Sequence, residues 1–214
     1  MTLTAIAFPA ATDQTPQYLL VALHGWGANA QDLAGLAPYL KLENWQMLFP
    51  NGPFPHPQVP GGRMWYAFPK DYGFRNPPNF EGQVDLAQSR QQLTEWLLSL
   101  EAETGVPLHR TVLAGFSQGG AMTLDVGTQL PLAGLMVLSG YLHAPLTSQP
   151  TPSPILMIHG RHDPVVPVIL AQQAKAALLA QNLTVEYHER DMGHEIQPEM
   201  IVQMQHFCEI LWTK

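Results

Sequence analysis

Three residues of the sequence have the types and the order needed for covalent acyl transfer. Ser117 lies within Gly115–Gly119 (GFSQG), Asp163 follows an apolar run, and His194 lies in a later Gly-containing segment. A serine hydroxyl becomes a good nucleophile when a histidine removes its proton, and a carboxylate must hold that histidine in the correct tautomer. The sequence therefore offers Ser117 as nucleophile, Asp163 as orienting acid and His194 as base.

The surroundings of Ser117 are typical of a nucleophile elbow. An apolar run at 111–114 precedes the serine, and a helix-like segment at 121–125 follows it. In such a strand, turn and helix the serine adopts a strained backbone conformation that projects its hydroxyl above the sheet. Gly115 and Gly119 lack the Cβ atoms that would collide in so tight a turn. This pattern occurs by chance in roughly a few per cent of chains, so its partners must support it.

Asp163 and His194 are the best partners because each follows a predicted strand. Parallel α/β sheets gather their chemistry beyond the carboxyl ends of the strands. Asp163 comes after the apolar run 155–158 and before the proline-rich stretch 164–167, and His194 follows the run 183–188. Taken alone, Asp163 is also compatible with a helix N-cap or an Asx turn, and His194 with an exposed loop histidine.

Most other histidines and acids have ordinary explanations. His24 and His159 each end a strand just before a glycine, so we expect structural roles for them. His162 neighbours Asp163 but should point away from it, and Asp125 falls within a helical pattern. The remaining histidines show no metal-ligand spacing, so we predict no metal and no cofactor: His56, His109, His143, His188 and His206.

Acyl transfer also needs hydrogen-bond donors for the oxyanion of the tetrahedral intermediate. The elbow supplies one, the backbone N–H of Gln118 at the start of its helix. The second should come from the loop after an earlier strand, and Leu23–Gly27 (LHGWG) fits, because its glycines let the backbone approach the substrate. We therefore expect the N–H of Trp26 to be the second donor, with a plain glycine-rich turn as the alternative.

Apolar runs alternate with helical patterns along the whole chain, which predicts an α/β fold with a mostly parallel twisted sheet and helices on both faces. We expect a single domain over residues 1–214. The predicted strands are 18–23, 45–49, 111–114, 135–138, 155–158 and 183–188, with 3–8 as an antiparallel edge strand. The predicted helices are 31–40, 83–103, 119–130, 165–181 and 197–212.

Residues 50–80 interrupt this alternation with a segment dense in proline, glycine and aromatic residues. A loop this long in a compact domain is usually functional or disordered, and disordered segments are poor in aromatics. We therefore expect it to form a wall of the substrate pocket, the alternative being that it only packs over the core. Trp65, Tyr66, Tyr141 and Leu142 are the predicted pocket residues, although the same side chains would also suit the core.

Composition excludes several classes of function. The chain has 10 Lys and Arg against 17 Asp and Glu, a formal net charge of −7, so a nucleic-acid partner is not expected. Its one cysteine, Cys208, cannot form an internal disulfide. No run of 18 apolar residues and no basic N-terminal region are present, which predicts a cytoplasmic protein without integral membrane association. A monomer and a homodimer are both compatible with the sequence.

Together these motifs resemble the phospholipase/carboxylesterase family of α/β hydrolases, the group that includes the acyl-protein thioesterases. The residues that carry the resemblance span almost the whole chain: 23–27, 65–66, 115–121, 138–142, 159–167 and 192–194. The resemblance implies an α/β-hydrolase fold with no large cap domain. It also implies Ser117, Asp163 and His194 as catalytic triad, with the N–H groups of Trp26 and Gln118 as oxyanion hole.

The oxyanion loop differs from that of the thioesterase branch. That branch usually has leucine at the position of Trp26 and an acidic residue after the second glycine, where this chain has Ala28 and Asn29. In this respect the loop resembles that of the bacterial carboxylesterases.

The sequence thus predicts a serine carboxylesterase that acts on apolar esters with a short- to medium-length acyl chain, through an acyl-enzyme. A lysophospholipase and an acyl or acyl-protein thioesterase are the near alternatives, since a triad does not distinguish an oxygen ester from a thioester. A non-catalytic lipid or ligand binder on the same fold is a further alternative, less expected because all three triad residues are present. A peptidase is not expected, since no additional domain fits in 214 residues.

Overall fold

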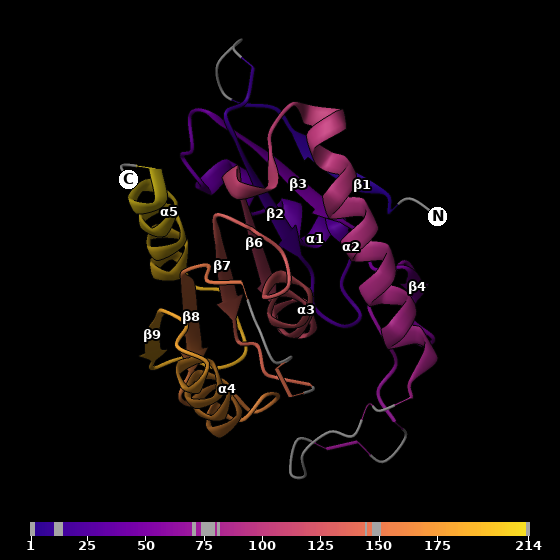
Figure 1. Ribbon diagram of the computed structural model, residues 1–214. Coiled ribbons are helices and arrows are strands. Elements are labelled where there is room, and N and C mark those ends of the chain that lie inside the picture. Colours follow the sequence, from indigo (N-terminus) through magenta and orange to yellow (C-terminus); the bar gives the residue numbers. More distant parts are fainter. Residues whose placement is uncertain are drawn as a thin grey trace.

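The centre of the molecule is a seven-stranded sheet with the strand order β1-β3-β2-β6-β7-β8-β9 (Figure 1). The computed structural model describes residues 3–10, 15–69, 72–73, 80, 82–143, 145–146 and 151–212. The strands of this sheet are β1 (Ala5–Phe8), β2 (Tyr18–Leu23), β3 (Trp45–Pro50), β6 (Thr111–Phe116), β7 (Gly134–Leu138), β8 (Ile155–Gly160) and β9 (Val185–Arg190). All neighbours pair in parallel except β1, which runs antiparallel to β3. The expected mostly parallel sheet and its antiparallel edge strand are confirmed.

Helices cover both faces of the sheet, as expected. They are α1 (Ala30–Ala34), α2 (Val84–Thr104), α3 (Gln118–Gly127), α4 (Val168–Ala180) and α5 (Pro198–Trp212). Alternate residues of each strand point to opposite sides, so Val21 packs in the apolar cluster beneath α2, α3 and α4, while Leu20 packs in the cluster beneath α1 and α5. This sheet, covered by helices on both sides, is an α/β-hydrolase fold.

Three predicted helix boundaries are wrong, two of them beside a proline, and the third is the helix expected over 119–130, which ends at Gly127. The single helix expected over 31–40 is instead the short helix α1, which Asn29 caps, followed by a 3-10 turn at Ala37–Tyr39. Pro38 in that turn has no N–H to continue an α-helix. The helix expected from Val165 begins at Val168, with Pro167 at its N-cap.

The segment 50–80 contains a small hairpin that the sequence pattern did not predict. Strands β4 (Phe54–Pro55) and β5 (Arg63–Met64) pair antiparallel apart from the main sheet. Two parts of the segment, 70–71 and 74–79, lie outside the described residues.

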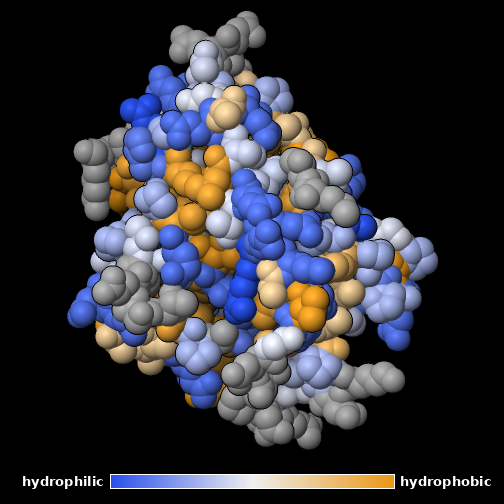
Figure 2. Space-filling view, turned by 45° about the vertical axis from the view of Figure 1, so that its right-hand side comes forward, coloured by the Kyte–Doolittle hydropathy of each residue, from blue (hydrophilic) through white to orange (hydrophobic). Residues whose placement is uncertain are grey.

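The outer face of α2 is polar. Figure 2, in which this side of the molecule is turned forward, shows hydrophilic side chains over much of the face, with smaller apolar areas among them. Gln91 and Glu95 lie one turn apart on the exposed side of α2 and form a hydrogen bond of 2.8 Å. The buried side of the helix, with Leu93 and Leu97, packs on the core.

Helix α3 approaches the sheet so closely that two glycines are required where they meet. A Cβ atom on Gly119 would lie 2.2 Å from the carbonyl oxygen of Leu23, and one on Gly115 would lie 2.2 Å from that of Gly119. Both obstacles are backbone atoms, which cannot move aside as the end of a flexible side chain does. The glycines therefore allow α3 to begin directly above the ends of β2 and β6.

We predict that Gly115→Ala lowers the free energy of unfolding by more than about 2 kcal/mol, because the added methyl group must displace the backbone of α3. Urea denaturation measures the change. The control is Gly73→Ala, where an added Cβ meets no atom of the described residues within 4 Å and φ is not positive. Similar stability of the two variants would contradict the close-packing argument.

Candidate active site

Ser117 lies on the turn between β6 and α3 and has the strained backbone expected of a nucleophile elbow. Its φ and ψ are 54° and −116°, values that residues with a side chain rarely adopt. The surrounding backbone fixes this conformation, since the N–H of Ser117 donates to the carbonyl oxygen of Leu138 at 2.8 Å and its own carbonyl oxygen accepts from Ala121 at 3.0 Å. The residue is 8% exposed, in a tightly packed turn.

Asp163 and His194 form a direct hydrogen bond. The Nδ1 atom of His194 lies 2.7 Å from Oδ2 of Asp163. The other carboxylate oxygen, Oδ1, accepts from the N–H groups of Val165 and Val166, both at 2.8 Å. The Asx-turn interpretation of Asp163 is therefore confirmed for one oxygen, while the second oxygen is free to hold the histidine.

The carboxyl group of Asp163 is held in its ionised form. Burial alone would raise its pKa, but the hydrogen bonds from His194 and from the N–H groups of Val166 and Val165 outweigh burial and hold the pKa below its usual range. An ionised carboxylate can only accept, so Nδ1 of His194 carries the proton. The other ring nitrogen, Nε2, is then the one able to take a proton from a neighbour.

The loops that carry Asp163 and His194 contact each other through their backbones. The N–H of His162 donates to the carbonyl oxygen of Met192 at 3.1 Å. A Cβ on Gly160 would lie 2.4 Å from the carbonyl oxygens of both Met192 and Gly193, so the two loops touch through their backbones. The side chain of His162 is mostly exposed, as expected, near Asp191 on the surface.

His194 also lies beside the elbow. Its ring packs against that of Phe116, the residue before Ser117, with 4.8 Å between ring centroids. Only 15% of the His194 side chain is exposed, so it is not a free loop histidine. The structure thus brings the base, the acid and the elbow to the same edge of the sheet.

The predicted oxyanion loop lies next to Ser117. A Cβ on Gly25 would lie 3.4 Å from the Cβ of Ser117. Among the described residues, neither the N–H of Trp26 nor that of Gln118 donates a backbone or side-chain hydrogen bond that the structure records. Gln118 is fully buried at 0% exposed, whereas the Trp26 side chain is 42% exposed, so a role of the two N–H groups as oxyanion hole stays a prediction.

His24 supports the predicted oxyanion loop through hydrogen bonds, which fits its expected structural role. Its Nε2 accepts from the N–H of Gly52 at 2.9 Å, so its Nδ1 carries the proton and donates to the carbonyl oxygen of Gly25 at 2.7 Å. The indole N–H of Trp65 donates to the carbonyl oxygen of His24 at 3.0 Å. Burial lowers the pKa of His24 to about 4, which keeps the ring neutral near pH 7.

The side chain of Gln118 joins the elbow to the segment 50–80. Its Oε1 accepts from the N–H of Trp65 at 2.9 Å, and its Nε2 donates to the carbonyl oxygen of Tyr66 at 2.7 Å. The sequence identified Gln118 only for its backbone N–H. This second role comes from a contact across more than 50 residues, for which the sequence gives no local signal.

The four predicted pocket residues are mostly interior. Trp65 and Tyr66 are 0% exposed and Tyr141 is 1% exposed, while Leu142 is partly buried. A role as substrate wall stays a prediction for these side chains.

Phe68 is a better placed aromatic that the sequence analysis did not single out. Its ring contacts that of Trp26 at 5.5 Å between centroids, and it packs against the cluster formed by Ala121, Tyr141 and Val166. Ala121 lies one turn after the elbow and Val166 beside the acid loop, so Phe68 adjoins several parts of the site. The aromatic density of residues 50–80 indicated the segment but not this residue.

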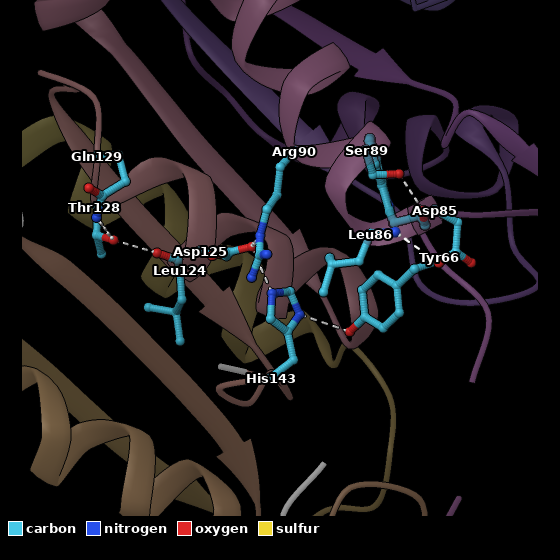
Figure 3. A network of polar contacts seen from close by, with 11 residues as sticks. Tyr66, Asp85, Leu86, Ser89, Arg90, Leu124, Asp125, Thr128, Gln129 and His143 are labelled. Carbon is cyan, nitrogen blue, oxygen red and sulfur yellow. Dashed lines mark hydrogen bonds and ion pairs between the residues drawn. The ribbon is translucent and has the colours of Figure 1, made fainter. Parts of the chain in front are cut away.

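A buried polar network supports the same region from the side of α2 (Figure 3). Asp125 binds Arg90, and it accepts from Nε2 of His143 at 2.8 Å. Nδ1 of His143 lies 3.0 Å from the hydroxyl of Tyr66, which lies 2.7 Å from that of Tyr141. The sequence analysis missed this network, because Asp125 and His143 come together only through the packing of α3 against the chain after β7.

The protonation states of Asp125 and Tyr66 determine part of this network. Burial would raise the pKa of Asp125, but His143 and Arg90 outweigh it and hold the pKa below its usual value. Burial raises the pKa of Tyr66 well above 10, so the phenol keeps its proton. Asp125 therefore accepts from Nε2–H of His143, and the hydroxyl of Tyr66 lies within hydrogen-bond distance of both Nδ1 of His143 and the hydroxyl of Tyr141, contacts that fix the ring of Tyr66 against the elbow side of the core.

The described residues contain neither a metal-binding cluster nor a membrane-spanning helix. No three His, Cys, Asp or Glu side chains in them converge in a way that would hold a metal ion. None of the helices they form is long and apolar enough to cross a lipid bilayer.

The comparisons with known proteins agree with the fold. The chain belongs to the phospholipase/carboxylesterase family, whose model matches residues 5–212. The crystal structure of esterase PE8 is similar, with a TM-score of 0.87 and 28% identity, over 99% of this chain and 100% of that one. The Bacillus cereus carboxylesterase shares the fold, with a TM-score of 0.80 at 18% identity, over 98% of this chain and 94% of that one.

Curated relatives are fungal enzymes of the same family. Acyl-protein thioesterase 1 of Schizosaccharomyces pombe is 31% identical over 205 residues, 89% of each chain. The protein of the same name from Saccharomyces cerevisiae is 26% identical, over 94% of this chain and 95% of that one. The chain is accordingly a hydrolase of the phospholipase/carboxylesterase family.

We predict that the protein loses stability as the pH falls from about 6.5 to about 4. In that range the unfolded chain takes up a proton at His24 that the folded protein refuses, so stability present above pH 6.5 is progressively lost. The loss from this residue amounts to up to about 3 kcal/mol. Urea denaturation at pH 7 and pH 4.5 measures it.

The matched variant is His24→Gln, which keeps an acceptor near the N–H of Gly52 but does not titrate. It should lose less stability than the wild type between the two pH values. Burial also lowers the pKa of His159, which contributes equally to both proteins and cancels in the comparison. Equal losses in the two proteins would contradict the assignment to His24.

Proposed function

We propose that this protein is a serine carboxylesterase that hydrolyses carboxylic esters of short to medium acyl chain length. The observation that supports this most directly is the strained backbone of Ser117 beside the hydrogen-bonded pair of His194 and Asp163. Strain of this kind is retained where the surrounding structure enforces it, commonly at catalytic nucleophiles.

In the proposed mechanism, Nε2 of His194 takes the proton of the Ser117 hydroxyl as the oxygen attacks the ester carbonyl. Asp163, already ionised, holds Nδ1–H of His194 and stabilises the imidazolium that forms. The carbonyl oxygen becomes an oxyanion, which the N–H groups of Trp26 and Gln118 would stabilise as hydrogen-bond donors.

His194 then gives its proton to the departing alkoxide, and an alcohol leaves. The acyl group remains on Ser117 as an ester. A water molecule loses a proton to His194 and attacks this ester, and the second tetrahedral intermediate collapses as His194 returns the proton to the departing Ser117 oxygen, which releases the carboxylic acid and the free enzyme.

An acyl thioesterase is the second candidate function. It is favoured by the fungal relatives, which bear the name acyl-protein thioesterase 1, at 31% and 26% identity. The same triad cleaves a thioester, since the attack and the oxyanion are alike and only the leaving group changes. The partly exposed aromatic surface of Trp26 and Phe68 suits an apolar acyl group in either case.

We predict that Ser117→Ala lowers kcat/KM for p-nitrophenyl butyrate by at least about 10,000-fold, because the covalent step has no nucleophile. The wild type should also be labelled by a fluorophosphonate probe, which reacts only with an activated serine, and the variant should not.

The control is Ser139→Ala. Ser139 is also buried and has a similar backbone strain, with φ of 49°, but it has no place in the proposed mechanism. It should retain labelling and hydrolysis. If the folded wild type were not labelled, a lipid or ligand binder without catalysis would be favoured instead.

We predict that kcat/KM across p-nitrophenyl esters from acetate to palmitate peaks at short to medium chain lengths. An acyl-coenzyme A thioester of the best chain length and a lysophospholipid are measured beside them. A thioester that reacts more than about tenfold faster than the matched oxygen ester would favour the thioesterase, and a preference for the lysophospholipid would favour a lysophospholipase.

A further inference from the structure

His56 is buried in the hairpin loop between β4 and β5, and one of its ring nitrogens closes a turn. Only 7% of the residue is exposed. Its Nδ1 accepts from the N–H groups of Gln58 at 3.1 Å and Val59 at 3.0 Å. An imidazole nitrogen that accepts carries no proton, so the neutral ring has its proton on Nε2.

The protonated edge of His56 faces the predicted oxyanion loop. A Cβ on Gly27 would lie 3.6 Å from Cδ2 and 3.8 Å from Nε2 of His56. Nε2 is buried and has no hydrogen-bond partner among the described residues. The imidazole lies against the indole of Trp26, with centroids 4.1 Å apart and ring planes at 73°. In this near-perpendicular arrangement the edge of one ring meets the face of the other, and the indole is the aromatic group in contact with the His56 ring.

Backbone hydrogen bonds fasten the same hairpin to the oxyanion loop. The N–H of Gly27 donates to the carbonyl oxygen of Arg63 at 2.9 Å, and the N–H of Arg63 donates to that of Ala28 at 2.8 Å. The hairpin is closed by the N–H of His56, which donates to the carbonyl oxygen of Gly62 at 2.8 Å. These bonds hold the chain after Trp26, whereas the His56 ring holds Trp26 itself.

The turn at Trp26 is closed by one long backbone hydrogen bond, from the N–H of Ala28 to the carbonyl oxygen of Gly25 at 3.3 Å, which the ring contact with His56 supplements. Gly27 has a φ of 81°, so the chain reverses sharply directly after Trp26. The Trp26 side chain is 42% exposed, and the rings it contacts are those of His56 and Phe68. Rotation of this residue would turn its backbone N–H away from the position above Ser117.

We infer that His56 is a positioning residue of the oxyanion hole: it holds the indole of Trp26 and thereby aims the backbone N–H of Trp26 at the developing oxyanion. The inference rests on the proposed function, because it assigns a role in the tetrahedral intermediate. His56 itself does not contact the reacting atoms. Its effect should therefore appear in the chemical step and not in substrate binding.

The test is His56→Asn. The Oδ1 atom of asparagine can replace Nδ1 as acceptor for Gln58 and Val59, so the turn is preserved while the ring contact with Trp26 is lost. We expect kcat for p-nitrophenyl butyrate to fall about tenfold or more with KM changed less than about twofold, since a misaimed oxyanion donor weakens only the transition state. Gln58→Ala, whose side chain is exposed, is the matched control and should behave as wild type.

A double-mutant cycle with Trp26→Leu shows whether His56 acts through the indole. Each single variant should lower kcat, and the double variant should be no slower than the slower single one. If His56→Asn is poorly folded, Trp26→Leu alone must still lower kcat, whereas its KM is not diagnostic because the Trp26 side chain belongs to the proposed acyl surface; an unchanged kcat in Trp26→Leu would then overturn the inference.

An NMR signature distinguishes positioning from general stability. In the wild type, ¹⁵N–¹H spectra of the imidazoles should show His56 as the Nε2–H tautomer with its proton shifted upfield by the indole ring, and Trp26→Leu should abolish that shift. An unchanged kcat in a folded His56→Asn variant, with wild-type labelling of Ser117 by the fluorophosphonate, would overturn this inference and leave the esterase proposal intact. Absence of labelling in the wild type would instead overturn the proposed function.

Discussion

The backbone of Ser117 is the constraint on which the rest of the site depends. A conformation with φ of 54° is unfavourable for a residue with a side chain, so it persists only where the surroundings leave the chain no other path. Here α3 begins directly against the end of β2, with glycine at the points of contact, and the N–H of Ser117 is bonded to the neighbouring strand β7. The strain is thus maintained by packing that the whole sheet provides.

The acid and base meet the elbow because they come from adjacent strands of the same sheet. Asp163 follows β8 and His194 follows β9, and the backbone contacts between their loops hold the two side chains together. The carboxylate divides its two oxygens between a turn and the histidine. The loop after β8 needs the ionised Asp163 for its turn, and the same turn holds the carboxylate in place to bind His194.

The sequence was sufficient to predict the placement of residues that depends on local pattern and strand order. The elbow at Ser117 has a local signature, and Asp163 and His194 were selected because each follows a strand. The parallel sheet and its antiparallel first strand were also predicted correctly from the alternation of apolar runs. These features depend on neighbours in sequence or on a simple rule of topology.

What the sequence did not reveal depends on contacts between distant segments. His56 and His143 appeared to be scattered histidines, yet each is buried in a specific contact with an aromatic residue elsewhere in the chain. Trp65 and Tyr66 have the composition of a pocket wall but lie in the interior, where their backbone is bound by Gln118. Side-chain direction in a long irregular segment is set by such contacts, and no periodicity records it.

The amide of Gln118 has a consequence for how this site can diverge. Its oxygen accepts from Trp65 while its nitrogen donates to Tyr66, and only a group with both capacities can bind that backbone in this way. These two bonds hold the backbone of Trp65 and Tyr66 beside Ser117. The number of residues between the hairpin at Phe54–Met64 and this attachment point is therefore constrained. Residues inserted between the hairpin and Trp65 would displace the backbone that Gln118 binds. Residues inserted after Ala67 would leave that backbone in place. Enlargement of the substrate site over evolution is therefore confined to the part of the chain that follows the residues bound by the Gln118 amide.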